Sequence, residues 1–338
     1  MIFEILSLSF LILFLFLINF ILVKSNLLIH SNSNEEHKKF GLDQIPLSGG
    51  LFFFIVLLYL SIPQNYISNI IILFIFFYLF LGLLVDYGVE INPKLRLIIQ
   101  TVLTLSMVFL CEIYINKTNL FFLDYFLDSI FFNIFFSSFC ILVIINGLNF
   151  MDGVNNNVIG YCLLLLLSII FIEHRNLSLQ NIDFYNFLLI ALLVFYLFNF
   201  FNQVYLGDAG IYILSVSFSI IVILFINKSN YVSPLLAINL LWYPAFETLF
   251  SMSRKLLSKQ NPFKPDTKHF HTLLLKFLGH YKIKNKNTIS GLLLNLALLP
   301  NFFIAINFYN NSKIILMTTI VYMLLYSLLY LKLSTLKR

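Results

Sequence analysis

The sequence predicts an all-α, polytopic helical membrane protein, and its composition and its long apolar runs support this class. Of the 338 residues, 60% are hydrophobic and only 11% are charged, whereas an ordinary soluble domain carries about 25% charged residues. A bilayer-spanning helix needs roughly 20 consecutive apolar residues. Because lipid cannot satisfy open backbone groups, such runs must be helical. We therefore expect a single integral membrane domain over residues 1–338.

Polar, proline or glycine residues divide the chain into about eleven apolar segments, with ten as the alternative count. The first segment, Ile2–Val23, lacks a basic leader and a small-residue cleavage site, so we expect a span rather than a signal peptide. The Phe-rich stretch Phe121–Phe136 is expected to be interfacial in its first half and to begin a span in its second. The expected breaks lie near residues 24–45, 63–66, 86–94, 115–131, 149–157, 174–183, 201–209, 227–231, 251–287 and 309–313.

Lysine and arginine are distributed unevenly over the expected loops. With eleven spans and the N-terminus outside, four of the 21 Lys and Arg residues fall in outer loops and the other seventeen fall in inner loops or the C-terminal tail. Cytoplasmic loops carry an excess of these residues. The sequence therefore predicts an N-out, C-in protein with a long basic cytoplasmic loop at residues 251–287. The same bias accounts for the net charge of +6 without a nucleic-acid partner.

Acidic, amide and imidazole side chains gather at the predicted inner ends of the spans. A carboxylate at membrane depth is costly unless it pairs, binds a metal or lines a wet cavity. One such residue is usually a helix cap, but several on one face beside a basic loop indicate a site. Asp and Asn oxygens suit a magnesium ion that bridges substrate phosphates. The residues concerned are Asp86, Asp152, Asp208, Asp266, Asn149, Asn155, His269 and His271.

Five segments carry these residues in a recognisable order. They are PLSGGLFFF (Pro46–Phe54), LGLLVDYGVEINPKLRL, NGLNFMDGVNN, YLGDAG and KPDTKHFHTLL. They match a P-x-x-GG opening, an acidic loop after the third span, N-x-x-N-x-x-DG-x-[DN], GD-[TSA]-G and D-x-x-H-x-H. By these motifs the chain resembles the polyprenyl-phosphate N-acetylhexosamine-1-phosphate transferases, glycosyltransferase family 4.

The resemblance implies a reaction and the roles of individual residues. Undecaprenyl phosphate would attack the β-phosphorus of a UDP-N-acetylhexosamine at the cytoplasmic face of a bacterial inner membrane, release UMP and initiate a surface glycan such as O-antigen. Asp86, Asp152 and Asp208 are the implied catalytic residues, with Asp86 near the attacking phosphate. Asp208 and Asp152 are the implied ligands of Mg²⁺, with Mn²⁺ as the alternative metal. The implied substrate contacts are Asn149, Asn155, Lys94, Arg96, Asp266, His269 and His271. A homodimer stays open.

The chain departs from the family pattern at several positions. Val85 stands where members commonly have a first acid beside Asp86, which puts in doubt any mechanism that needs both. Asn155 replaces an Asp found in many members, and Asn156 with Asn157 replaces a usual Gly-Leu. The segment HFHT has two histidines where the cell-wall branch has three, which favours the branch that initiates surface glycans.

Three other functions stay open at this point. The first is the cell-wall step of a phospho-N-acetylmuramoyl-pentapeptide transferase. The second is a lipid or sugar transporter, although transporters usually place acids near the bilayer midplane in repeated broken helices. The third is an inactive relative that retains the binding motifs. Glu247, an acid inside the ninth expected span, is a further functional hypothesis, with a cap on the wall of the site as its alternative role.

Overall fold

The computed structural model describes residues 2–31, 44–61, 68–177, 181–261, 266–281 and 283–335. Within these ranges the chain forms thirteen α-helices and one short antiparallel ribbon, in which β1 (Ile29–Ser31) pairs with β2 (Gln44–Pro46). The predicted class, an all-α polytopic membrane protein, is confirmed. The beginning of the KPDTKHFHTLL motif, residues 264–265, lies outside the described ranges.

Eleven of the described helices correspond to the eleven predicted apolar segments. Nine are long and apolar enough to cross a membrane. The other two are α3 (Gly49–Ser61), which has 13 residues, and α11 (Leu236–Leu257), which contains Pro244 and three charged residues. The nine are α1 (Ile2–Ser25), α4 (Asn69–Asp86), α5 (Pro93–Cys111), α7 (Ile130–Met151), α8 (Asn157–Arg175), α9 (Ile182–Phe200), α10 (Gly207–Lys228), α13 (Lys286–Phe308) and α14 (Ser312–Thr335). The number of true spans and the N-out orientation stay predictions.

Two further helices lie in segments that the sequence analysis assigned to loops. The helix α6 (Phe121–Leu127) has seven residues and precedes α7, in the stretch expected to be interfacial. The helix α12 (Phe270–His280) has 11 residues and lies in the long basic loop. Both are too short to cross a bilayer, which needs roughly 20 residues.

Local capping and backbone conformation explain where two of the helices beside the motifs begin. Asn92 caps α5 by accepting a hydrogen bond from the Lys94 amide at 3.0 Å, and Pro93 occupies the first turn, where its missing N–H costs nothing. Asn156 precedes α8 in a left-handed conformation with φ of 64°. Asparagine tolerates this conformation better than most residues do. Asn156 can therefore occupy the position at which the family pattern has glycine.

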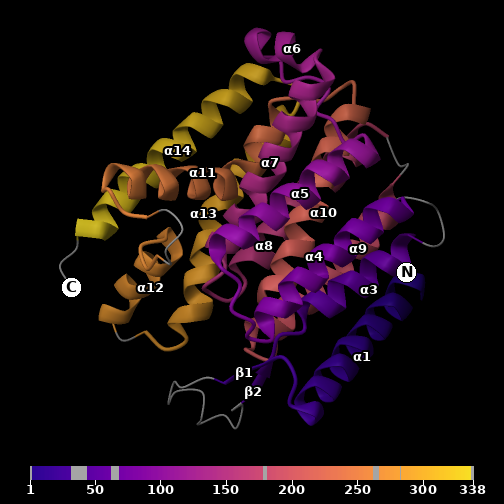
Figure 1. Cartoon of the computed structure of the whole chain (residues 1–338), viewed down its shortest axis with the longest axis vertical. Helices are drawn as coiled ribbons and strands as arrows, with labels where there is room; N and C mark the ends of the chain where they lie inside the picture. The colour runs from indigo at the N-terminus through magenta and orange to yellow at the C-terminus, as the bar shows by residue number, and fades with distance from the viewer. Residues whose placement is uncertain are drawn as a thin grey trace. The chain divides into compact units, whose positions relative to one another are not determined.

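One of the two compact units of the chain contains residues 1–91 and 180–214. Here α1 packs on α9, α3 packs on both α4 and α9, and the ribbon lies beside α1 (Figure 1). The centre of the α3–α9 contact is aromatic. The Phe195 ring lies 5.8 Å from the ring of Phe52 and 5.2 Å from that of Phe53. These distances are typical of favourable aromatic pairs.

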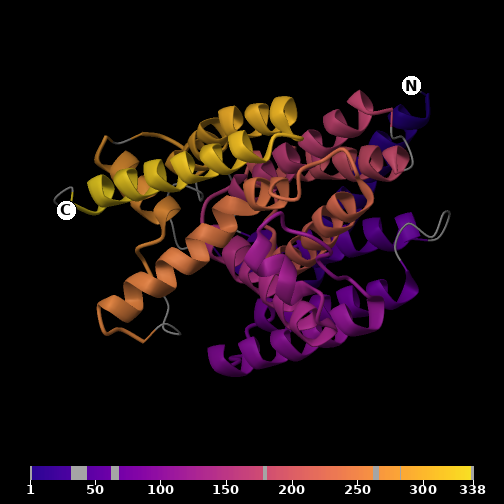
Figure 2. The same cartoon turned by 90° about the horizontal axis from the view of Figure 1, so that it is seen from above.

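The other unit contains residues 92–179 and 215–338. Its main helix pairs are α7 with α11, α8 with α13, and α5 with α7. The yellow α14 runs beside α13 in both views (Figures 1 and 2). Asn239 of α11 donates to Asn301 of α13 at 3.1 Å and to Thr319 of α14 at 2.9 Å. Such interhelical polar bonds are typical of helix packing in membranes.

Candidate functional site

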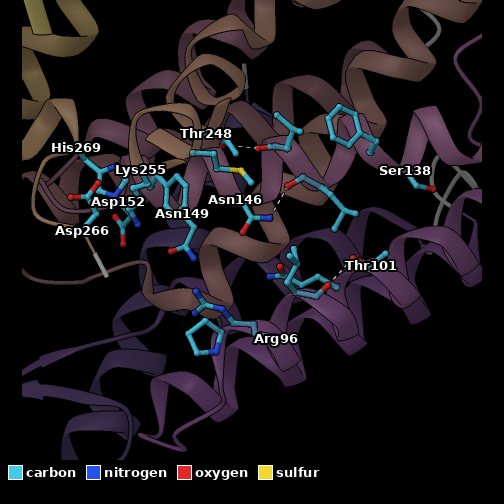
Figure 3. A pocket seen from close by; sticks show the side chains of 18 of the residues that line it. Arg96, Thr101, Ser138, Asn146, Asn149, Asp152, Thr248, Lys255, Asp266 and His269 are labelled. Carbon is cyan, nitrogen blue, oxygen red and sulfur yellow. Dashed lines mark hydrogen bonds between the residues drawn. The ribbon is translucent and has the colours of Figure 1, made fainter. Parts of the chain in front are cut away.

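A cavity of about 630 Å³ in the second unit brings together most of the predicted site residues. It lies between α5, α7, α11 and the beginning of α12, and we call it the α5–α7–α11 pocket (Figure 3). At one end the labelled side chains of Asn149, Asp152, Lys255, Asp266 and His269 lie close together. The polar lining also includes Arg96, Gln100, Asn146, Thr248 and His271.

The same pocket continues along an apolar wall. This wall extends between α5 and α7 in the direction of Thr101 and Ser138, away from the charged end (Figure 3). It is formed by Leu97 and Leu105 of α5 together with Phe135, Phe139, Leu142 and Val143 of α7. The pocket is therefore amphipathic, with charged and hydrogen-bonding groups at one end and hydrocarbon along the rest.

The C-terminal end of α7 places Asn149 and Asp152 in the pocket. Asp152 follows the last helical residue with φ of −80° and ψ of 105°, so the chain turns out of the helix and leaves its carboxylate exposed. The side chain of Asn157 donates to the Met151 carbonyl at 2.7 Å, which satisfies one orphan acceptor of the helix end. This hydrogen bond, between residues at the two ends of the turn from α7 to α8, stabilises the turn.

Gly153 brings two motifs together that lie far apart in the sequence. A Cβ atom added at this position would meet the imidazole of His271. The glycine of the Asp-Gly pair therefore lets the backbone pass directly beside the His-x-His segment. Close backbone approach of this kind is a common reason for glycine.

Asn155, a predicted substrate contact, lies outside the lining of the α5–α7–α11 pocket. It is buried, and its backbone amide donates to the Asn287 side chain at 3.0 Å. Nearby, Asn295 donates to the Asn156 carbonyl at 2.7 Å. These bonds attach the turn before α8 to α13. In the structure Asn155 supports the turn that carries Asp152.

The two histidines begin α12 and are both buried in the pocket wall. Their rings are nearly parallel, with planes 5° apart and centroids 5.9 Å apart. His269 Nδ1 lies 2.9 Å from Glu247 Oε1 of α11, and its ring centroid is 4.7 Å from that of Phe150. His271 Nε2 lies 2.9 Å from the Thr272 hydroxyl. The two rings therefore have different polar surroundings.

The charges at this end of the pocket are modulated by burial and by neighbours. Burial lowers the pKa of His271 to about 4, with the Glu247 charge opposing and the His269 charge adding to the shift. For Asp266, burial raises the pKa, but hydrogen bonds from Arg254 and from the Lys268 amide outweigh it. The pKa of Asp266 is therefore below its ordinary value. At neutral pH the pocket holds a neutral His271 and an ionised Asp266.

Asp86 and Asp208 lie in the first unit. The Asp86 carboxylate ends α4 and accepts hydrogen bonds from the backbone amides of Asp208, at 2.7 Å, and Ala209, at 3.1 Å. These amides belong to the first turn of α10, where helix N–H groups have no partner within the helix. Gly207 has φ of 68°, and a Cβ atom there would meet the Asp86 carboxylate.

The two cations expected in α5 have different positions. Arg96 lines the α5–α7–α11 pocket, whereas Lys94 is exposed and is not part of the lining. Lys255, which the sequence analysis did not single out, is buried in the pocket wall. Glu247, Ser251 and Lys255 are all buried and follow one another at intervals of four, the spacing of one helix face. This polar stripe is the signal that could have identified Lys255.

Within the described ranges, no group of three or more His, Cys, Asp or Glu side chains is arranged to hold a metal ion. This does not conflict with magnesium, which usually keeps several waters and binds through one or two carboxylates together with substrate phosphates. Asp152 and Asn149 offer oxygen ligands of this kind in the pocket. The donor set therefore fits a magnesium–phosphate complex better than a dedicated metal cage.

Comparison with known proteins gives consistent matches. The family model described as glycosyl transferase family 4 matches residues 68–226. The undecaprenyl-phosphate alpha-N-acetylglucosaminyl 1-phosphate transferase of Salmonella typhi is 24% identical over 283 residues, which are 78% of this chain and 73% of the relative. The protein of the same name in Thermotoga maritima is 26% identical over 260 residues, 77% of this chain and 76% of the relative. A probable undecaprenyl-phosphate N-acetylglucosaminyl 1-phosphate transferase of Bacillus subtilis is 29% identical over 143 residues, 41% of this chain and 40% of the relative.

Proposed function

We propose that this chain, which matches glycosyl transferase family 4 over residues 68–226, moves N-acetylhexosamine 1-phosphate from a UDP-sugar to undecaprenyl phosphate. N-acetylglucosamine is the first sugar to test, because the relatives are named for it. We further propose that the product initiates a surface glycan such as O-antigen.

The amphipathic lining of the α5–α7–α11 pocket is the observation that supports this proposal most directly. A lipid phosphate has a hydrocarbon chain and a charged head, and its reaction partner is a nucleotide diphosphate. Arg96 and Lys255 can neutralise phosphate charge at one end of the pocket. The apolar wall between α5 and α7, which includes Phe135 and Phe139, can accommodate the first isoprene units. The apolar wall is the feature that favours a lipid acceptor, because a pocket lined only by polar groups could bind a water-soluble acceptor just as well.

The proposed reaction is an in-line displacement at phosphorus. An oxygen of the lipid phosphate forms a bond with the β-phosphorus of the donor, the bond from that phosphorus to the bridging oxygen breaks, and UMP leaves with the electron pair. Most of the catalysis in such a reaction comes from positioning and charge stabilisation. We assign these tasks to Arg96, Lys255 and His269, and the orientation of the diphosphate to Asn149.

We propose Mg²⁺ as the metal, with Mn²⁺ as the alternative, and the candidate ligands are Asp152 in the second unit and Asp208 in the first. When bound, the ion would neutralise charge on the diphosphate and on the leaving UMP. Asp152 is supported by its exposed carboxylate in the pocket. Asp208 is supported by the GD-[TSA]-G motif alone. The distribution of Lys and Arg supports a pocket that opens to the cytoplasm.

The full chain in detergent, supplied with undecaprenyl phosphate and a panel of UDP-sugars, tests the proposal through UMP release. The panel contains UDP-N-acetylglucosamine, UDP-N-acetylgalactosamine and UDP-N-acetylmuramoyl-pentapeptide, each with and without magnesium. We expect UMP only when lipid, magnesium and an N-acetylhexosamine donor are all present. Release from the pentapeptide donor alone would favour the cell-wall step. No release from any donor by folded protein would contradict the transferase proposal.

A matched pair of substitutions connects this activity to the pocket. Asp152→Asn removes a charge from the pocket lining, and Asp128→Asn makes the same change at an exposed position at the end of α6 that is not part of the lining. We expect UMP release to be lost in the first variant and retained in the second. Equal activity of the two variants would place the reaction elsewhere.

A further inference from the structure

Glu247 is a carboxylate buried inside the helix bundle of the second unit. Its side chain is 1% exposed and projects from α11 toward α12 and α14. A buried carboxylate is stable only when its oxygens are satisfied by hydrogen-bond donors or by a positive charge. Here Oε1 lies 2.9 Å from His269 Nδ1 and 3.4 Å from the Ser251 hydroxyl, and Oε2 accepts a hydrogen bond from Tyr326. Glu247 therefore joins three helices through its two oxygens.

The contact with Glu247 determines which nitrogen of His269 carries a proton. An ionised carboxylate can only accept hydrogen bonds, so the His269 Nδ1 beside it must be the donor. The bond that one ring nitrogen makes decides the state of the other. With Nδ1–H directed to Glu247, Nε2 is the nitrogen available to the pocket that His269 lines.

His271 shows that this arrangement is specific to one histidine of the His-x-His pair. Among the residues that the structure describes, no carboxylate is bonded to its ring. Its Nε2 lies near the Thr272 hydroxyl, and its buried Nδ1 has no hydrogen-bond partner among the described residues. The two parallel rings thus differ in the feature that orients an imidazole for catalysis, a carboxylate on the nitrogen away from the substrate.

We propose that Glu247 is a positioning residue, which holds His269 with Nδ1–H on the carboxylate and directs the lone pair of Nε2 into the pocket, where it accepts the proton of a phosphate hydroxyl of the bound substrates. Glu247 itself touches neither substrate and acts through His269. The proposal rests on the transferase function proposed above. Tyr326 and Ser251 complete the arrangement by fixing the carboxylate, and the Phe150 ring limits rotation of the imidazole.

The protonation state of His269 gives the first test, and it needs no enzymatic activity. We would label the full chain with ¹⁵N-histidine and record long-range ¹H–¹⁵N spectra at about pH 8, above the ordinary histidine pKa. The signal of His269 is assigned by its loss in His269→Asn. We expect a protonated Nδ1 in the wild type and a shift toward a protonated Nε2 in Glu247→Met, which removes the acceptor but keeps the side-chain length. An Nε2–H form in the wild type, or no change in the variant, would overturn the proposal.

A double-mutant cycle gives the second test, through kcat for UMP release. Glu247→Met should lower kcat by roughly tenfold to hundredfold, as the loss of a residue that orients a functional histidine does. In a His269→Asn background the same substitution should have no further effect, because Glu247 acts only through His269. Equal losses in both backgrounds would show that Glu247 has a general structural role and overturn the proposal.

Glu173→Met is the matched control for this cycle. Like Glu247, Glu173 is a buried glutamate in a helix of the same unit and is not part of the pocket lining, but it lies in the last turn of α8, whereas Glu247 contacts His269. Its replacement should leave kcat of the folded protein within about twofold of the wild type. A loss as large as that of Glu247→Met would contradict the proposed specificity. An inactive wild-type protein would contradict the transferase function, whereas the spectra would still decide whether Glu247 orients His269.

Discussion

The Asp86 carboxylate accepts a hydrogen bond of 2.7 Å from the backbone amide of Asp208, and a second one from the amide of Ala209. The end of α4 thereby caps the beginning of α10, although 122 residues separate Asp86 from Asp208. Both Asp86 oxygens are engaged with backbone, which supports an orienting role over that of a general base. Only the second acid of the family's usual pair can take this role here, because Val85 occupies the first position.

Replacing Asp86 with asparagine should reduce both stability and activity. An amide can accept from one of the two α10 amides, but its NH₂ group would face the other donor. Leaving a half-buried donor unsatisfied costs about 1–3 kcal/mol. We expect a lower apparent melting temperature in detergent and a nearly complete loss of UMP release. Lys94→Ala, at the exposed start of α5, is the comparison and should retain more activity and the wild-type melting temperature. Similar losses in the two variants would contradict the capping role.

Asp208→Asn should abolish magnesium-dependent activity without destabilising the fold. Asp86 bonds the backbone amide of residue 208 and not its side chain, so the substitution leaves this cap in place. We therefore expect wild-type folding together with loss of magnesium-dependent UMP release. A magnesium titration of activity and a melting curve measure the two effects on the same sample. Full activity of the variant would remove Asp208 from the proposed ligands.

Gly153→Ala should impair activity with little effect on the rest of the fold. The new methyl group would meet the His271 imidazole and force the turn that carries Asp152 away from α12. We expect kcat for UMP release to fall at least about tenfold, since small displacements of positioned groups are costly for catalysis. Gly279→Ala is the control, because its Cβ would meet only the Lys286 side chain, at 3.8 Å or more. Unchanged kcat in Gly153→Ala would show that the contact between the two motifs is not needed.

The helices could be predicted from the sequence because each long apolar run has to satisfy its own backbone in lipid. The eleven expected segments therefore appear as eleven helices. The helices α6 and α12 could not be predicted in this way, since their seven and 11 residues are too few for a span. Pro244 interrupts the pattern of α11, yet that helix continues through it.

The candidate site was predictable only in part. The motifs identified Asp152, Asn149 and the two histidines, and the pocket contains all of them. Sequence could not show that Asn155 is bonded to α13 and supports the turn that carries Asp152, because its partner Asn287 lies 132 residues away. Nor could it show that the Glu247 carboxylate contacts the His269 ring. The spacing of Glu247, Ser251 and Lys255 at intervals of four does indicate a polar face on this helix.

Acidification should destabilise the protein through His271. Burial lowers the pKa of His271 in the folded chain to about 4, whereas a histidine in an unfolded chain titrates near 6.5. The unfolded state therefore binds a proton first as the pH falls, and the stability that neutral His271 contributes is present above about pH 6.5 and is lost progressively toward pH 4. This difference between the folded and unfolded pKa values of His271 changes the free energy of unfolding by an amount on the order of 3 kcal/mol.

Melting curves between about pH 7.5 and pH 4.5 can test whether stability falls as the pH is lowered. The apparent melting temperature of the wild type should fall as the pH is lowered, and His271→Asn should show a smaller fall because it removes the group that titrates. His280→Asn, at an exposed position at the other end of α12, should keep the wild-type dependence. If His271→Asn and the wild type lose stability in parallel, another group is responsible and His271 is not held neutral by its burial beside Gly153.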